Sequence, residues 1–252
     1  MTEIIRNDKK GISSFIIRLF ALIVMTCGIV LTYRYNLRME WVKHLSWIPY
    51  PIFAFLLAVG FDETSDRIKY FLRLLLFALL SEIPYDYLCS GKLINWRIQN
   101  GMLTLCVGYL VLCIIRFVHK KLNNIIITCA VIYFAGFGAY WLCKRFNFEF
   151  YAFGIMFIEF FYVSRHVKYQ KLLQLLLVSF LTFYVSTETY LTFIIGNIQY
   201  SIPYKAFSFI SLLIIWLYNE KRGPNKLWLK IAFYLYYPLM LVVLGLINTF
   251  IA

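Results

Sequence analysis

Residues 12–33 read ISSFIIRLFALIVMTCGIVLTY, an apolar run that is interrupted by one charged side chain, Arg18. A helix needs roughly 20 mainly apolar residues to cross the hydrocarbon core of a bilayer. The run therefore predicts a transmembrane helix. It is too long for the core of a signal peptide, and no A-x-A site follows it, so we expect it to stay attached to the chain.

Similar apolar runs continue to the end of the chain. Together they predict nine transmembrane helices, at about 12–33, 47–61, 68–89, 101–118, 122–142, 148–163, 171–186, 203–218 and 227–251. Residues 187–199 are apolar but short, so they are either a re-entrant piece or the end of a broken span. No stretch between the runs is long enough for a second domain. The sequence predicts an all-α membrane protein, a polytopic helix bundle in which residues 1–252 form one integral-membrane domain.

The composition excludes soluble and disordered classes of protein. Hydrophobic residues make up 62% and charged residues 15% of the 252 residues, against roughly 45–50% and about 25% in soluble domains. A net charge of +13 would suggest nucleic-acid binding in a soluble protein. Here the basic residues lie in short loops, where lipid headgroups explain them. An anionic soluble ligand is the alternative, and nucleic acid is not expected.

The distribution of Lys and Arg predicts the orientation in the cell membrane. With a cytoplasmic N-terminus, the inside segments hold fifteen of these residues and the outside segments hold eight. The outside residues are Arg34, Arg38, Lys43, Lys92, Arg97, Lys144, Arg145 and Lys205. The excess favours a cytoplasmic N-terminus, and nine spans would then place the C-terminus outside.

Charged residues within apolar runs are the best pointers to a site, because burying a charge costs about 2.5–3.5 kcal/mol on insertion scales. The third run holds Arg73, Glu82 and Asp86. The spacing of four places both carboxylates on one helical face, and Pro84 loosens the backbone between them. This face either lines a polar pocket or marks the helix end in contact with headgroup water.

Two further glutamates lie in the sixth run. Glu149 opens that run and is, with Glu82 and Asp86, a candidate general base. Glu159 lies deeper, among phenylalanines, and therefore needs a buried partner. Arg73 is one candidate for that partner.

The histidines and cysteines form no recognisable catalytic or metal-binding motif. His44, His119 and His166 lie in predicted loops beside Lys or Arg, which favours a solvated role. The six cysteines include no CxxC pair and read as small packing residues. No metal site is predicted, and the residues alone indicate no specific reaction.

Three stretches in register resemble the TraX family of polytopic membrane proteins. They are residues 51–61 with Thr64, residues 70–86 with the motif Ser81-Glu-Ile-Pro-Tyr-Asp86, and residues 218–239 with the motif Tyr218-Asn-Glu-Lys-Arg-Gly223. The order and spacing match from about residue 15 to the C-terminus. The resemblance implies a helical bundle similar to the membrane acyltransferases, and acetylation of the N-terminal amine of a conjugative pilin with acetyl-coenzyme A as donor.

The same resemblance implies the positions of binding residues. It marks Arg73, Asn219, Arg222 and Tyr237 as candidates for binding substrate or acetyl-coenzyme A. We expect Arg73, Asn219 and Arg222 to converge with Glu82 and Asp86 on one polar region, because an isolated buried charge is costly.

The chain departs from the family pattern where a proton acceptor is expected. The Asp-His pair usual in the first span is replaced by Gly28-Ile29, and the final Tyr-Pro-Leu-His reads Tyr237-Pro-Leu-Met240. The Asp-Tyr-Gly motif appears as Glu149-Phe-Tyr151, before Gly154. Neither Ile nor Met can take a proton from an acceptor.

Three hypotheses about function follow. The first is a catalytically degenerate relative with a binding, assembly or processing role. The second is an active acyltransferase that acetylates an amine or hydroxyl of a peptide, pilin or glycan, using a carboxylate as base. The third is a small-solute transporter, although no inverted repeat is visible. The substrate and the oligomeric state stay open.

Overall fold

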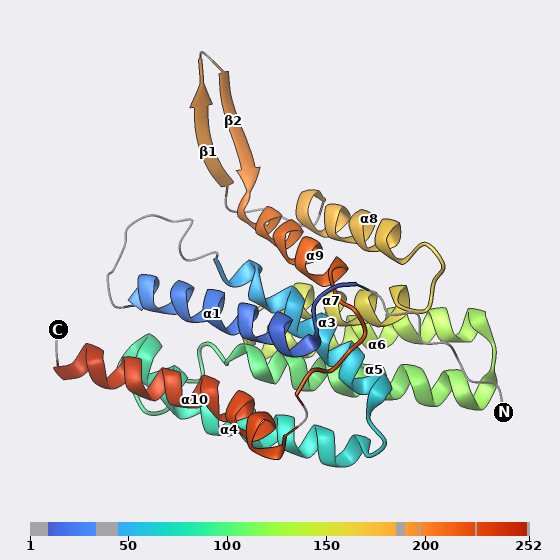
Figure 1. Ribbon diagram of the computed structural model, residues 1–252, viewed down its shortest axis with the longest axis horizontal. Coiled ribbons are helices and arrows are strands. Elements are labelled where there is room, and N and C mark those ends of the chain that lie inside the picture. Colours follow the sequence, from blue (N-terminus) through green and yellow to red (C-terminus); the bar gives the residue numbers. More distant parts are fainter. Residues whose placement is uncertain (1–9, 34–44, 185–189, 197, 225, 251–252) are drawn as a thin grey trace.

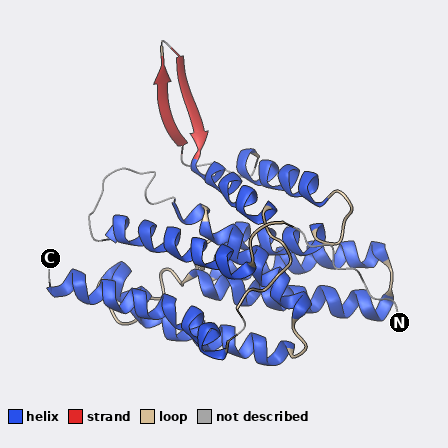
Figure 2. Ribbon diagram, in the orientation of Figure 1, coloured by secondary structure: helices blue, strands red, loops and turns tan. Residues whose placement is uncertain are grey.

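The computed structural model describes residues 10–33, 45–184, 190–196, 198–224 and 226–250. Five residues of the charge count, and one histidine, lie outside these ranges: Arg6, Lys9, Arg34, Arg38, Lys43 and His44. The described chain is mostly helical (Figure 2).

Nine α-helices lie in the described ranges. They are α1 Ser14–Tyr33, α3 Pro49–Glu63, α4 Arg67–Ser90, α5 Gly101–Leu122, α6 Ile125–Arg145, α7 Tyr151–Ser164, α8 Gln170–Phe183, α9 Ser208–Trp216 and α10 Leu227–Phe250. Short 3₁₀ turns, η1 Leu45–Trp47 and η2 Tyr204–Phe207, precede α3 and α9. Each of the nine predicted runs overlaps one α-helix.

Four of these helices, α1, α5, α6 and α10, are long and apolar enough to cross a membrane. The helices α7 and α8 have 14 residues each, which at about 1.5 Å per residue is shorter than a hydrocarbon core of roughly 30 Å. The helix α4 has 24 residues but carries several charged side chains. The described structure therefore supports a polytopic membrane protein. The helix lengths do not support the more detailed prediction of nine spans.

The sequence predicts a re-entrant piece or the end of a broken span at residues 187–199, but the described part of this segment is a β-hairpin, so the described chain is mostly helical and not all-α. Two strands, β1 Tyr190–Ile195 and β2 Ile198–Pro203, pair antiparallel, and the hairpin projects away from the helices (Figure 1). Gly196 has φ +63°, the left-handed backbone that tight hairpin turns require. The described residues of this segment therefore do not form the helical end of a span.

The helix α3 forms the centre of the bundle. Its side chains are buried on nearly all sides, and it packs against α1, α5, α7 and α9. The ring of Phe55 meets that of Phe161 edge-on, with centroids 5.7 Å apart. Around this core, α4 pairs with α10, and α5 pairs with α6 (Figure 1).

Two isolated parallel β-bridges join segments that are distant in sequence. Ile12 pairs with Tyr218, and Gln99 pairs with Phe148. The first bridge ties the start of α1 to the segment after α9. The second holds the loop before α5 against the loop before α7, and this contact builds the site described next.

Candidate functional site

The start of α5 organises the candidate site. Asn100 caps this helix, because its side-chain oxygen accepts hydrogen bonds from the backbone N–H groups of Met102 at 2.9 Å and Leu103 at 3.3 Å. The amide nitrogen of the same side chain donates to the carbonyl of Ala78 at 2.9 Å and to the carboxylate of Glu82. A buried asparagine thus joins α4 to α5.

Two carboxylates bind consecutive backbone N–H groups at this helix start. Glu82 Oε2 accepts from the N–H of Asn100 at 3.2 Å, and Glu149 Oε2 accepts from the N–H of Gly101 at 3.1 Å. The N-terminus of a helix carries partial positive charge and unpaired donors, which favour anions. Gly101 permits this approach, since a Cβ on it would lie 3.2 Å from Glu149 Oε2.

Glu149 lies in the loop between α6 and α7, outside the helices. Burial is the main cause that raises its pKa to about 7, and the charge of Glu82 acts in the same direction. Hydrogen bonds from the Gly101 N–H and the Tyr85 side chain oppose this shift. A carboxyl with this pKa can both accept and release a proton near neutral pH.

Asp86 has a structural contact one turn further along α4. Its Oδ2 accepts a 2.6 Å hydrogen bond from the backbone N–H of Asn95, which holds the loop between α4 and α5. The predicted common face of Glu82 and Asp86 is confirmed, because both side chains contact residues 95–100.

A cavity of about 400 Å³ adjoins the carboxylates, between α1, α3, α4, α5 and α10. Its walls are mostly apolar, and among the described residues that line it Glu149 is the acidic one. Tyr50 and Tyr237 are also among the residues that line it. The buried Tyr50 hydroxyl has no hydrogen-bond partner in the described structure. The cavity therefore offers apolar packing and a few polar contacts, the usual composition of a ligand pocket.

The family model for "TraX protein" matches residues 13–248. The chain belongs to the TraX family. No curated protein and no solved structure matches it. The resemblance carried by the three motifs is thus confirmed over nearly the whole chain.

The two positions where the resemblance implies histidine, Ile29 and Met240, lie near one another. Gly28 and Ile29 line the cavity, and Ile29 packs against the buried cluster that contains Tyr237 and Met240. The sulfur of Met240 accepts a 3.3 Å hydrogen bond from the Thr26 hydroxyl. These positions lie close together although they belong to α1 and α10. Gly28, Ile29 and Met240 offer no group that can take a proton.

Arg73 does not join the carboxylates. It is exposed, its Nε donates to the Lys69 carbonyl at 3.3 Å, and its guanidinium lies 6.0 Å from the centre of the Tyr70 ring. The proposed pairing of Arg73 with Glu159 is wrong. Glu159 instead points at Gly136 of α6, where an added Cβ would lie 2.6 Å from its Oε2.

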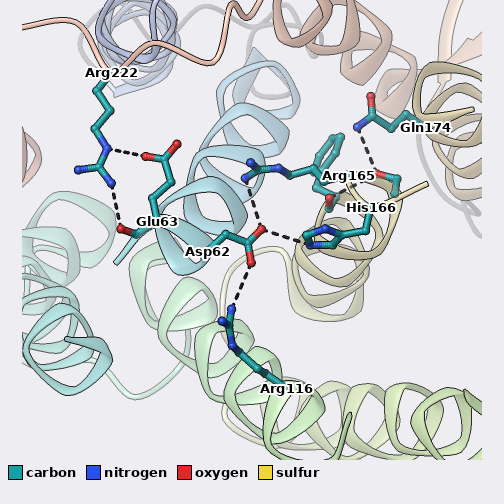
Figure 3. A network of polar contacts seen from close by, with 9 residues as sticks. Asp62, Glu63, Arg116, Arg165, His166, Gln174 and Arg222 are labelled. Atoms are coloured by element: carbon teal, nitrogen blue, oxygen red, sulfur yellow. Dashed lines mark hydrogen bonds and ion pairs between the residues drawn. The ribbon is translucent and has the colours of Figure 1, made fainter. Parts of the chain in front are cut away.

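Asn219 and Arg222 also lie apart from the carboxylates. The Asn219 amide donates to the Gly11 carbonyl at 3.1 Å, and Arg222 Nε binds Glu63 Oε2 at 2.5 Å (Figure 3). Glu63 precedes α4, and Glu82 lies fifteen residues after the first residue of α4, which is about 22 Å along the helix axis. The prediction that Arg73, Glu82, Asp86, Asn219 and Arg222 form one polar region is therefore wrong.

The two described histidines have polar neighbours. His119 Nδ1 lies 3.2 Å from the Thr128 hydroxyl, and His166 Nε2 lies 3.4 Å from Asp62 Oδ2. Both rings lie outside the cavity lining. Asn100 was missed by the sequence reasoning, although an asparagine directly before an apolar run is a signal for a helix start.

Proposed function

We propose that this TraX-family protein is a catalytically degenerate relative of the membrane acyltransferases, and that its cavity binds the apolar chain of a lipid or of an acylated partner. The observation that supports this is the replacement of both expected histidines by Ile29 and Met240, which pack together beside the cavity. A pocket with apolar walls but without the expected imidazoles can still bind an apolar ligand. It lacks the group that would accept a proton during acetyl transfer.

The lining is suited to an acyl chain. Leu22, Leu57 and Leu105 provide apolar contact area, while Glu149 at the same surface offers hydrogen bonds to a polar end group. Such a division between apolar walls and a few polar groups orients a ligand as well as binding it. Ligand binding without catalysis is compatible with a binding, assembly or processing role.

Photocrosslinking tests the binding proposal. A phospholipid with a diazirine near the end of one acyl chain should label residues that line the cavity in the full chain. Leu105→Trp fills the cavity and should reduce that labelling several-fold. Leu110→Trp is the matched control, because Leu110 lies on the exposed side of the same helix. Equal labelling of the cavity in both variants would contradict the proposal.

A second function, acetyl transfer, is favoured by one specific arrangement. Glu149 lines the cavity. A guanidinium next to it would lower its pKa and pair with its carboxylate, but Arg73 donates to the Lys69 carbonyl instead. In this scheme Glu149 takes the proton of an acceptor amine or hydroxyl on a peptide, pilin or glycan. The acceptor forms a bond to the acetyl carbon of acetyl-coenzyme A, the carbon–sulfur bond breaks, and coenzyme A leaves as its thiolate.

An acetylation assay separates the two functions. Purified protein in lipid, labelled acetyl-coenzyme A and peptide or glycan acceptors should give little turnover if the protein is degenerate. Robust turnover that is lost in Glu149→Gln but kept in Asp86→Asn would favour the enzyme. Turnover that appears only after Gly28→Asp, Ile29→His and Met240→His are combined would favour lost chemistry on a retained fold.

A further inference from the structure

Three arginines gather near Asp62 and the neighbouring Phe61, at the opposite end of α4 from the carboxylate site. Asp62, at the end of α3, lies 3.5 Å from Arg116 of α5 and 3.7 Å from Arg165, which follows α7 (Figure 3). Arg67, the first residue of α4, places its guanidinium 5.3 Å from the centre of the Phe61 ring, and Arg116 lies 5.8 Å from the same ring. We call Arg67, Arg116 and Arg165 the arginine cluster.

The arginine cluster is short of negative charge. Arg116 and Arg165 share the single carboxylate of Asp62 with His166, whose Nε2 lies 3.4 Å from Oδ2. The neighbouring Glu63 is already held by Arg222 at 2.5 Å, so Asp62 is the one carboxylate in the described chain that these residues are shown to contact. The distances from Asp62 to its arginines are longer than those of a close charged hydrogen bond. Asp62 alone therefore cannot neutralise the cluster.

Hydrogen bonding within the arginine cluster is also incomplete. Within the described ranges, the buried atoms Arg67 Nε, Arg165 Nη1 and Asp62 Oδ2 have no hydrogen-bond partner. Arg165 Nη1 and Asp62 Oδ2 form only a 3.7 Å ion pair, and the Arg165 side chain is 18% exposed. Buried charged donors without acceptors are costly. The arrangement is explained if a further anion completes it.

We infer that the arginine cluster binds a phosphate group. Phosphate supplies up to two negative charges and several acceptor oxygens, and the planar fork of arginine matches its geometry. A single carboxylate would leave one positive charge unpaired. The cluster lies where α3 and α7 end and α4 begins, so the phosphate of a lipid headgroup and a free phosphate are both possible sources. This site is separate from the cavity of the proposed function.

Thermal unfolding in the presence of phosphate tests the inference. The full chain is purified in dodecyl maltoside, which carries no phosphate, and its Tm is measured with inorganic phosphate against chloride at equal ionic strength. A second series adds phosphatidic acid to the micelles. A rise in Tm with phosphatidic acid alone identifies a headgroup, and a rise with inorganic phosphate identifies a soluble phosphate. Either result supports the site, and no rise with either would overturn it.

Variants distinguish the arginine cluster from general surface charge. Arg165→Gln and Arg67→Gln should each weaken the apparent phosphate affinity about tenfold or more, since each removes a charged donor. Lys168→Gln is the matched control, because Lys168 is an exposed cation three residues from Arg165. An equal loss in Lys168→Gln would overturn the inference. If the arginine variants do not fold, native mass spectrometry of the unaltered protein still counts bound phosphate, and its absence decides against the site.

Asp62→Asn gives the sharpest readout. Asp62 competes with phosphate for the same guanidinium groups, so its neutralisation should raise the phosphate affinity several-fold while it lowers the Tm without phosphate. A purely structural role for the cluster predicts the lower Tm alone. Unchanged or weaker phosphate binding in Asp62→Asn would overturn the inference.

Discussion

At the scale of single residues, Asn100 connects the parts of the candidate site. It caps α5, donates to Glu82 and to the carbonyl of Ala78, and precedes the N–H that binds Glu149. Loss of its side chain would leave Glu82 and Ala78 without that donor. The position of Glu82 therefore depends directly on one buried amide, and Glu149 binds the helix start that the same residue caps.

We expect Asn100→Ala to destabilise the protein by about 1–2 kcal/mol or more, because a lost N-cap costs about this much and buried acceptors lose their donor. Asn124→Ala is the control. Asn124 caps α6 in the same way, through the N–H groups of Ile126 and Ile127, but it is exposed. Unfolding in mixed micelles measures both variants, and a loss for Asn124→Ala as large as that for Asn100→Ala would argue against the connecting role.

The protonation of Glu149 should change near neutral pH. With its pKa raised to about 7, the carboxyl is protonated below that pH and ionised above it. Infrared difference spectra across pH 7 should therefore show protonated-carboxyl absorption that falls as the pH rises, and Glu149→Gln should remove the part of this change that belongs to Glu149. Asp66→Asn should leave the change unaltered, because the Lys69 N–H holds the pKa of Asp66 below its usual range. A pH-dependent change of unaltered size in Glu149→Gln would assign the titration to another group.

Sequence reasoning found part of this site for a clear physical reason. The spacing of Glu82 and Asp86 is a local property of a helix, so their shared face was predictable. The meeting of Glu82 with Glu149 depends on the contact between two loops, Gln99 with Phe148, which no local pattern encodes. The family motifs likewise marked Arg73 and Arg222 but gave no information on the distance between them.

At the scale of elements, α6 and α7 pack closely at a glycine. Gly136 of α6 faces the Glu159 carboxylate, and a Cβ there would lie 2.6 Å from Oε2. Gly138 lies two residues further along α6 and has open space around it. The two glycines therefore form a natural pair for comparison.

Gly136→Ala should destabilise the protein by about 1–3 kcal/mol, because the methyl group overpacks the contact with Glu159. Gly138→Ala should be neutral or stabilising by up to about 1 kcal/mol, since alanine favours a helix over glycine. The melting temperatures of the two variants in detergent measure the difference. Equal shifts in the same direction would show that the α6–α7 contact is looser than described.

The accuracy of the element predictions also has physical causes. Long apolar runs such as residues 101–118 predicted helices well, because run length and apolarity are local properties. The hairpin was missed since its apolar residues were assigned to the membrane, although Gly196-Asn197 between β-branched residues is a turn signal. Short helices such as α8 were predicted as spans because apolarity alone does not report where a helix ends.

At the scale of the whole molecule, the four long apolar helices constrain the topology. The helix α6 is one of them, and basic residues lie at both of its ends: Lys120 and Lys121 near the end of α5, and Lys144 and Arg145 at the end of α6. A membrane around this bundle should separate the two groups. The cytoplasmic position of the N-terminus remains our proposal from the charge count.

Single cysteines at Lys120 and Lys144 should label from opposite sides of the membrane with an impermeant maleimide. The background must lack the six native cysteines, because Cys27 and Cys129 are exposed. Labelling of the Lys120 position from the cytoplasm would support the proposed orientation. Labelling of both positions from one side would show that α6 does not cross.

The bridge between Ile12 and Tyr218 affects how the chain is assembled during synthesis. The backbone of Ile12 bonds to Leu217 and Asn219, and that of Ser14 bonds to Lys221. At about 5–20 residues per second, a ribosome needs roughly 10–40 seconds after making Ile12 before it makes these partners. The segment at the start of α1 is thus made long before its partners, residues 217–221. Its backbone groups stay unpaired for most of translation, and during that time proteases and chaperones can reach them.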